Sequence, residues 1–221
     1  MDNERFFASV RQNLFDGSLS QDAVNGINAI ISAFDRYGDG NVRHLAYCLA
    51  TAQHETGRFR WLREIWGPTA AQRRYEGRAD LGNNQAGDGK RFMGRGYVHI
   101  TGRRNYADWS RRLGVDLVGN PDLAEDSTIA ARVLVEGVIK GTFTGKKLAD
   151  YASFTDMRRT VNGTDKAALI AGYASDFLAA LTEAGWTSPP AEPAPQAPKR
   201  TRAVIRAQIN DLLDELQTAE A

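Results

Sequence analysis

The sequence predicts a mainly α-helical domain with one small β element and a long glycine-rich loop. Several segments have the apolar spacing of helices, and suitable N-cap residues precede two of them. Six glycines fall within residues 75–96. The chain has 221 residues, 42% of them hydrophobic and 25% charged, which is enough for one well-cored globular domain with appendages.

Helices are expected at six places within residues 1–187, the span assigned to this domain: about 3–15, 21–36, 42–56, 104–113, 127–141 and 165–184. Ser20 and Asn41 are suited to cap the second and third, because their side chains accept hydrogen bonds from free backbone N–H groups. Segment 75–96 is too rich in glycine for a helix of ordinary length, so a loop is expected there. The β-branched residues of "YVHIT", 97–101, predict a short strand after it.

Prolines mark the end of this domain. Five of the seven prolines lie in "SPPAEPAPQAP", 188–198, which predicts a stiff extended linker. Residues 199–221 then predict a short amphipathic helix with an apolar stripe of Ile205, Ile209, Leu212, Leu213 and Leu216. Its basic first half and acidic second half favour self-association, or docking on the domain, over binding to a membrane surface.

Charge is distributed unevenly along the chain. Residues 55–112 hold thirteen Lys or Arg against six Asp or Glu, a local +7, although the whole chain has a net charge of +1. This region is either a solvated arginine-rich face or an electropositive groove for a polyanion. Nucleic acid is disfavoured as the partner, because many of the arginines lie in the glycine-rich region rather than on one helix face or between stacking aromatics.

The stretch "TAQHETGRFRWLREIW", 51–66, contains residues suited to a metal site and residues suited to acid–base catalysis. A helical zinc pair would need a second histidine four residues after His54, and that position is Arg58. His44 and His99 have no matching spacing, and the single cysteine, Cys48, excludes a multi-cysteine metal site. We therefore expect no metal and no other cofactor.

Two glutamates are the better candidates. Glu55 continues the apolar face of helix 42–56 at its last turn, where desolvation and the helix dipole both favour the protonated form of a general acid. Glu64 follows nine residues later and can cooperate only if the helix ends between them. Gly57 is suited to end it as a left-handed C-cap. A separation of about 6.5–9.5 Å would admit a water and imply glycoside hydrolysis with inversion.

The glycine-rich loop is suited to lining a groove, because glycines let the backbone of a polymer approach closely. Arg95 lies between two glycines at the end of this loop. It is either a turn arginine or the partner that holds a catalytic carboxylate in place.

Three stretches occur in this order: "AQHETGRF", "RRYEGRADLGNNQAGDGKRFMGRGYVHITGRRNY" and "RRTVNG". Together they resemble the family 19 glycoside hydrolases over about residues 40–185. The resemblance is closer to the lysozyme-like bacteriophage endolysins of that family than to the plant chitinases. It implies a lysozyme-like helical domain in which the small β element and the glycine-rich loop line the cleft.

The resemblance also implies roles for individual residues. Glu55 matches the general acid, and Glu64 matches the base that activates water. Thr101 takes the place of a hydroxyl that helps to position this water.

Four residues are candidates for substrate binding. Asn105 and Asn162 match substrate-contacting asparagines of the family. His99 stands where the family usually has glutamine, which puts its sugar contact in doubt. Arg95 completes the candidate set.

Members of the family cleave chitin or peptidoglycan, and the local +7 fits the anionic peptidoglycan better. We therefore expect an endolysin that hydrolyses the MurNAc–GlcNAc β-1,4 bond with inversion. A chitinase and an inactive wall-binding module are the alternatives. No apolar run approaches the roughly 20 residues needed to span a bilayer, and the N-terminus lacks a signal peptide's basic start. The protein is then expected to stay in the host cytoplasm until a separate pore releases it to the wall.

Overall fold

The long helices form where the sequence predicts them, and a capping side chain precedes four of the six. The computed structural model describes residues 1–188. Ser20 Oγ accepts from the Ala23 N–H at 3.2 Å and Asn41 Oδ1 accepts from the Arg43 N–H at 3.0 Å, which confirms both predicted N-caps. The long helices are α1 (Asn3–Leu14), α2 (Gln21–Tyr37), α3 (Val42–Glu55), α6 (Arg103–Leu113), α7 (Ser127–Lys140) and α9 (Ala167–Glu183).

Short helical turns connect the long helices. The α-helical turns are α4 (Ala70–Arg73), α5 (Asp88–Arg91) and α8 (Phe154–Met157). The 3-10 turns are η1 (Ala79–Leu81), η2 (Pro121–Glu125), η3 (Leu148–Asp150) and η4 (Arg158–Thr160). Segment 75–96 therefore contains only η1 and α5, as its glycine content predicts. Over residues 1–188, none of the helices combines the length and the apolar character that crossing a bilayer requires.

The strand predicted for residues 97–101 is wrong. Residues 96–99 form a turn, in which the His99 N–H donates to the Gly96 carbonyl at 3.3 Å. Gly96 has φ 80° and His99 has φ 48°, so an extended run cannot continue through either residue. In the part of the chain that the structure describes, β pairing is limited to isolated bridges of Arg95 with Arg63 and with Ile100.

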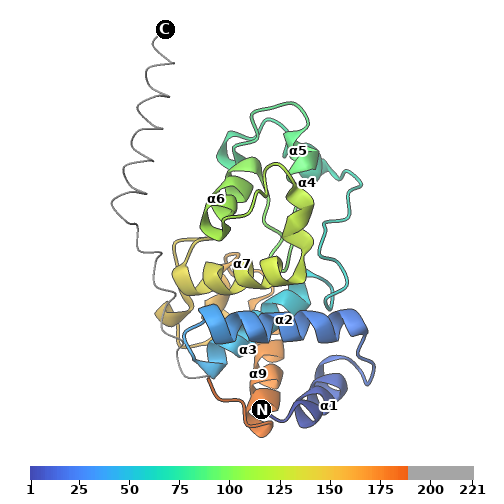
Figure 1. Ribbon diagram of the computed structural model, residues 1–221, viewed down its shortest axis with the longest axis vertical. Helices are drawn as coiled ribbons and strands as arrows, with labels where there is room; N and C mark the ends of the chain where they lie inside the picture. The colour runs from blue at the N-terminus through green and yellow to red at the C-terminus, as the bar shows by residue number, and fades with distance from the viewer. Residues whose placement is uncertain (189–221) are drawn as a thin grey trace, which may run out of the picture. The chain divides into compact units, whose positions relative to one another are not determined.

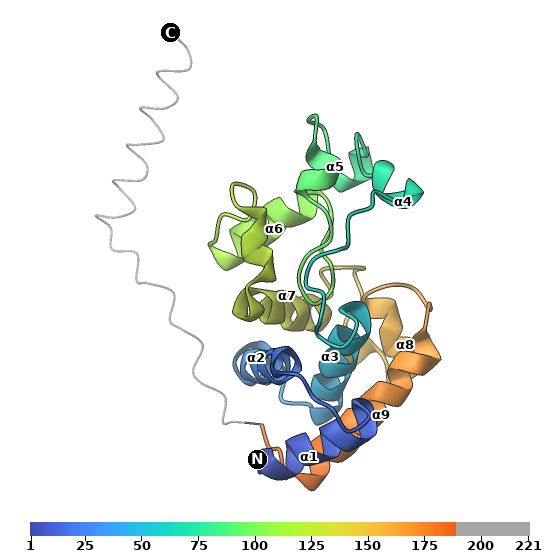
Figure 2. The same cartoon turned by 90° about the vertical axis from the view of Figure 1, so that its right-hand side faces the viewer.

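Two hydrophobic cores organise the described residues. The larger core is built by α1, α2, α3, α7, α8 and α9, with α3 packed along α9 and α2 packed along α7. The smaller core gathers Phe92, Tyr106, Trp109 and Leu117 around α6, and Val133 of α7 joins it. Figures 1 and 2 show α4, α5 and α6 together at one end and α1 and α9 at the other. The α7 helix therefore connects the two cores.

Two predictions fall outside this description. The predicted linker 188–198, apart from Ser188, and the predicted helix 199–221 lie beyond the described residues. Both stay predictions.

Candidate active site

A left-handed turn ends α3 immediately after Glu55. Gly57 has φ 56°, as expected for the predicted C-cap, and Arg58 and Phe59 follow with φ 67° and 66°. Left-handed conformations cost a residue with a side chain about 1 kcal/mol or more, so surrounding contacts must hold them. Phe59 is buried and its N–H donates to Thr56 Oγ1 at 2.9 Å. The turn separates the helix that positions Glu55 from the segment that positions Glu64.

Glu55 is held by an arginine that lies 103 positions later in the sequence. Arg158 Nη1 lies 2.5 Å from Glu55 Oε1, and the two side chains are 2% and 20% exposed. Arg158 Nε also donates to the Asp165 carbonyl at 3.0 Å, which fixes the orientation of the guanidinium. Arg158 lies in the "RRTVNG" motif but was not predicted as the partner of Glu55. The motif contains two adjacent arginines, and no local pattern says which one faces inward.

Glu64 is held by three donors on its own side of the turn. Oε1 accepts from Gln72 Nε2 at 2.9 Å and from the Tyr75 hydroxyl at 3.3 Å. Oε2 accepts from the Gly94 N–H at 3.1 Å. Each carboxylate oxygen therefore has a fixed donor, and the carboxylate has one defined orientation.

Gln72 is buried and uses both ends of its amide. Oε1 accepts from the N–H groups of Thr69 at 2.7 Å and Gly67 at 3.2 Å, while Nε2 donates to the Ile65 carbonyl as well as to Glu64. Two backbone N–H groups on the oxygen fix which end of the amide faces Glu64. Gln72 was not predicted as a site residue, although Thr69 and Gln72 have the spacing of a capping box.

Tyr75 is a stable donor to Glu64. Burial, followed by the charge of the adjacent Glu64, raises the pKa of the Tyr75 phenol above its ordinary value of 10.0. The hydroxyl therefore keeps its proton, and its ability to donate, across the neutral range.

The predicted residues after the glycine-rich loop lie next to one another. Thr101 Oγ1 donates to the His99 carbonyl at 2.9 Å, and Asn105 Nδ2 donates to the Thr101 carbonyl at 2.7 Å. Gly94 connects this group to Glu64. A Cβ at position 94 would lie 2.9 Å from the His99 side chain and 3.3 Å from Glu64 Oε2, so glycine is required for this close approach.

Arg95 does not contact either candidate catalytic glutamate. Its side chain is 5% exposed and pairs with Glu125 at 2.9 Å and Asp122 at 3.0 Å. Arg95 Nη1 also donates to the Tyr106 hydroxyl at 3.1 Å. The donors of Arg95 are directed to these partners, so Arg95 is the turn arginine, one of the two alternatives that the sequence allowed. The other alternative, that Arg95 holds a catalytic carboxylate, is wrong.

Asn162 lies beside the partner of Glu55. Its N–H donates to the Arg158 carbonyl at 3.0 Å, and the residue is exposed. It is therefore exposed one turn of the chain after Arg158, whereas His99, Thr101 and Asn105 are grouped near Glu64. The predicted residues thus form two groups, one for each glutamate.

Trp61 lies in the segment between Glu55 and Glu64 and was not predicted as a site residue. The side chain is 49% exposed, and a Cβ on Gly57 would lie 3.2 Å from Trp61 Cδ1. The Trp61 carbonyl lies 3.0 Å from His99 Nε2. Ile65, 67% exposed, follows in the same segment. An exposed indole in the segment between the two glutamates is suited to packing against the apolar face of a sugar ring.

His54 precedes Glu55 and has an altered acidity. Burial lowers the pKa of the imidazole below its ordinary value of 6.5, although the neighbouring Glu55 charge opposes this effect. A neutral imidazole therefore lies next to the proposed acid at neutral pH.

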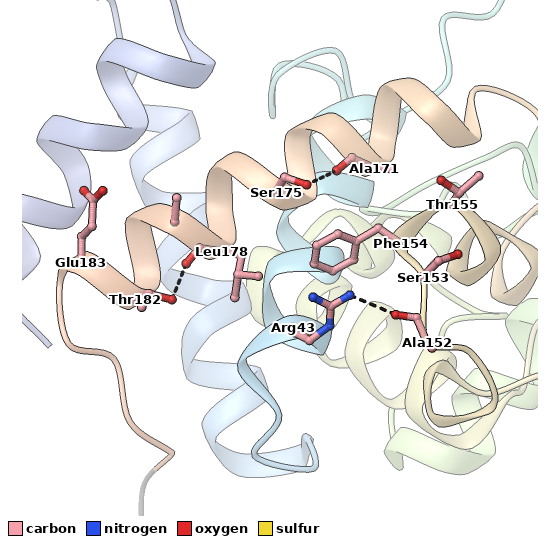
Figure 3. Close-up of a pocket in the computed structure, with 11 residues that line it drawn as sticks. Arg43, Ala152, Ser153, Phe154, Thr155, Ala171, Ser175, Leu178, Thr182 and Glu183 are labelled. Atoms are coloured by element: carbon pink, nitrogen blue, oxygen red, sulfur yellow. Dashed lines mark hydrogen bonds between the residues drawn. The ribbon is translucent and has the colours of Figure 1, made fainter.

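A separate groove lies along α9, where Figure 3 shows Phe154 and Arg43 at its wall. Its volume is about 790 Å³. Arg43 Nη2 donates to the Ala152 carbonyl at 3.0 Å and its guanidinium lies 4.3 Å from the centre of the Phe154 ring. None of the predicted site residues lines this groove. Over residues 1–188, no group of three or more His, Cys, Asp or Glu residues is placed to hold a metal ion.

Comparison with solved structures supports the fold. A bacterial family 19 chitinase superposes with a TM-score of 0.58 at 22% identity, covering 83% of this chain and 96% of that one. Chitinase C from Streptomyces griseus HUT6037 gives 0.57 at 19% identity, covering 83% and 77%. At these identities the likeness establishes a shared fold, and the predicted lysozyme-like helical fold of this family is confirmed.

Sequence relatives agree with the fold. A family 19 domain-containing protein of Haemophilus influenzae is 29% identical over 140 residues, covering 48% of this chain and 70% of that protein. Chitinase 5 of Oryza sativa subsp. japonica is 35% identical over 101 residues, covering 44% and 33%. The chain thus spans about a third of the length of the rice protein. The family model described as chitinase class I matches residues 17–136, more than half of the chain. The chain belongs to glycoside hydrolase family 19.

Proposed function

We propose that the protein is an inverting glycosidase that hydrolyses the MurNAc–GlcNAc β-1,4 bond of peptidoglycan, as an endolysin does. One observation carries the proposal: two glutamates on either side of a left-handed turn are each held by their own set of donors. Glycoside hydrolysis uses two carboxyl groups, one as the acid and one as the base.

Glu55 acts as the general acid in this proposal. It donates its proton to the glycosidic oxygen, and the bond from that oxygen to the anomeric carbon breaks. Proton donation leaves a carboxylate, which Arg158 stabilises from 2.5 Å. The arginine therefore favours the product of the proton transfer and fixes the carboxyl in place.

Glu64 acts as the general base. It takes a proton from a water that attacks the anomeric carbon from the face opposite the leaving group, which inverts the configuration. Gln72, Tyr75 and Gly94 orient its carboxylate. Thr101 donates its hydroxyl proton to the His99 carbonyl, so its oxygen lone pairs can accept a hydrogen bond from the same water.

Charge favours peptidoglycan as the substrate. Chitin is neutral, whereas peptidoglycan has carboxylates on its lactyl groups and peptides. The local +7 over residues 55–112 attracts such a polymer. Chitin hydrolysis is the second candidate, and the names of the plant relatives favour it. A wall-binding module without activity would have no need for donors arranged around both glutamates.

Mass analysis of the fragments released from purified peptidoglycan tests the proposal, with colloidal chitin in parallel. Muropeptides with a reducing MurNAc end are expected. Soluble chitin oligomers from the parallel sample, with no muropeptides, would establish the second candidate. Fragments with a 1,6-anhydro end would contradict hydrolysis and indicate a lytic transglycosylase.

A further inference from the structure

We propose that an arginine-lined groove beside Glu64 binds the carboxylates that peptidoglycan carries and chitin lacks. The inference rests on the proposed glycosidase function and assigns its preference for an anionic glycan to two residues, Arg73 and Arg74. These residues end α4 and begin the turn that follows it.

The groove borders the candidate active site at Tyr75. It is open, has a volume of about 790 Å³, and is lined by Ala71, Arg73, Arg74, Tyr75, Glu76 and Arg78. Tyr75 belongs to both places, since it lines the groove and its hydroxyl donates to Glu64 Oε1 at 3.3 Å. Its ring also packs against Trp66 with centroids 6.4 Å apart. The groove therefore lies next to a residue that contacts the proposed base.

Two of the four charged residues in the groove already have strong partners. Glu76 accepts from the N–H groups of Gly87 at 2.7 Å and Gly89 at 2.8 Å, which directs its carboxylate toward the glycine-rich loop. Arg78 is paired with Asp80 through two hydrogen bonds, at 2.5 and 2.9 Å. Neither residue is the main determinant of the charge that the groove offers to a ligand.

Among the described residues, neither Arg73 nor Arg74 is paired with a carboxylate. Arg73 Nη1 donates to the Pro68 carbonyl at 3.0 Å, and within residues 1–188 the Arg74 guanidinium makes neither a hydrogen bond nor an ion pair. Both residues are exposed. A guanidinium presents a planar fork of N–H donors that matches a carboxylate, whereas the hydroxyl and acetamido groups of chitin give it no charge to bind.

The test compares glycan strands with their carboxylates intact and the same strands after conversion of those carboxylates to neutral amides. Amidation should lower kcat/KM of the wild-type protein by about tenfold, because it removes the free-energy contributions of two exposed ion pairs. The R73Q/R74Q double variant should hydrolyse intact strands about tenfold more slowly than wild type and should cleave the two preparations at the same rate. Added salt should reduce the wild-type preference and leave the variant unchanged.

The R11Q variant is the matched control, because Arg11 is an exposed arginine of α1, at the opposite end of the described residues. It removes the same charge and should keep the wild-type preference. Thermal unfolding confirms that all variants are folded. The proposal is overturned if the double variant keeps the wild-type ratio between intact and amidated strands, or if R11Q loses it equally.

Failure of the proposed function has a different signature. In that case the wild-type protein releases no reducing ends from either preparation. Cosedimentation with the two preparations still tests the groove then, since binding to intact strands should be lost in the double variant and retained in R11Q. Equal binding by all three proteins would reject the groove independently of catalysis.

Discussion

Glu55 Oε1 and Arg158 Nη1 lie 2.5 Å apart, although 103 residues separate them in the chain. The contact joins the end of α3 to the beginning of η4. It gives the proposed acid a charged partner with a side chain that is only 2% exposed. Both the reactivity of Glu55 and the position of the loop after η4 depend on this contact.

Replacing Glu55 with glutamine should lower the hydrolysis rate by about 10²–10⁴-fold, because the amide cannot donate a catalytic proton. The amide oxygen can still accept from Arg158, so the fold should be kept. The rate of release of reducing ends measures the effect, and E183Q, at an exposed glutamate of α9, is the control. An E55Q protein with more than about a tenth of the wild-type rate would show that Glu55 is not the acid.

Replacing Arg158 with lysine should lower kcat by about tenfold and change KM little. Lysine keeps the charge but has no group equivalent to Nε, which donates to the Asp165 carbonyl. The free energy of unfolding should fall by about 1 kcal/mol. Steady-state kinetics and denaturant unfolding measure both effects. R159K is the control, because Arg159 is an exposed neighbour with a longer contact of 3.5 Å to Asp156. Equal losses in R158K and R159K would refute the specific role of Arg158.

Replacing Gln72 with glutamate should change the dependence of the rate on pH. The new carboxylate keeps the acceptor for Thr69 and Gly67 but turns a charged oxygen toward Glu64, where Nε2 now lies at 2.9 Å. Two facing carboxylates bind one proton more tightly than either alone, so the acidic limb of the kcat profile should move up by about one pH unit.

The control for this variant is Q12E, at an exposed position of α1, which should leave the profile unchanged. Loss of stability in Q72E without movement of the acidic limb would mean that Gln72 only supports the fold. The pH profile thus separates positioning of the base from a purely structural role.

His54 should titrate below 6.5 in the folded protein, because burial disfavours its charged form. Between the folded pKa and 6.5, the unfolded chain binds a proton that the folded chain does not. This difference lowers the free energy of unfolding as the pH falls through that interval, and it vanishes above the interval. NMR titration of the imidazole measures the midpoint. A midpoint at or above 6.5 would contradict the prediction.

Early products should have the α configuration, since single displacement by water inverts a β-linked substrate. Proton NMR of the first minutes of hydrolysis, before mutarotation, distinguishes the anomers. Initial β product would mean a retaining route and would assign Glu64 a different role.

Local patterns were sufficient to predict the six long helices and the left-handed end of α3. Glu55 could be placed on the inner face of its helix, because side-chain direction along a helix follows from spacing alone. Gln72 could have been found by the same reasoning, since Thr69 and Gln72 form a capping box. These features depend on residues a few positions apart.

Long-range partners could not be predicted in this way. Arg95 could have balanced a catalytic carboxylate, but it pairs with Glu125, which lies 30 positions further along the chain. Arg158 contacts Glu55 only because α9 packs along α3 and α8 packs on α9. This packing brings the segment between α8 and α9 to the end of α3. The strand at 97–101 failed for a local reason, since β-branched residues favour extension but His99 adopts a positive φ.

The two glutamates take their partners from different parts of the molecule, Glu55 from η4 and Glu64 from residues 72–94. Among the described residues, no hydrogen bond joins one carboxylate to the other. The distance between the two carboxyl groups is therefore set by the turn at 57–59 and by the packing of the two cores. Because the separation of the two carboxyl groups decides between inversion and retention, a core substitution that changes this gap acts on the stereochemistry with every catalytic side chain in place. The choice between inversion and retention therefore depends on apolar core residues as well as on the two glutamates. A comparison of the acidic residues alone would not reveal it.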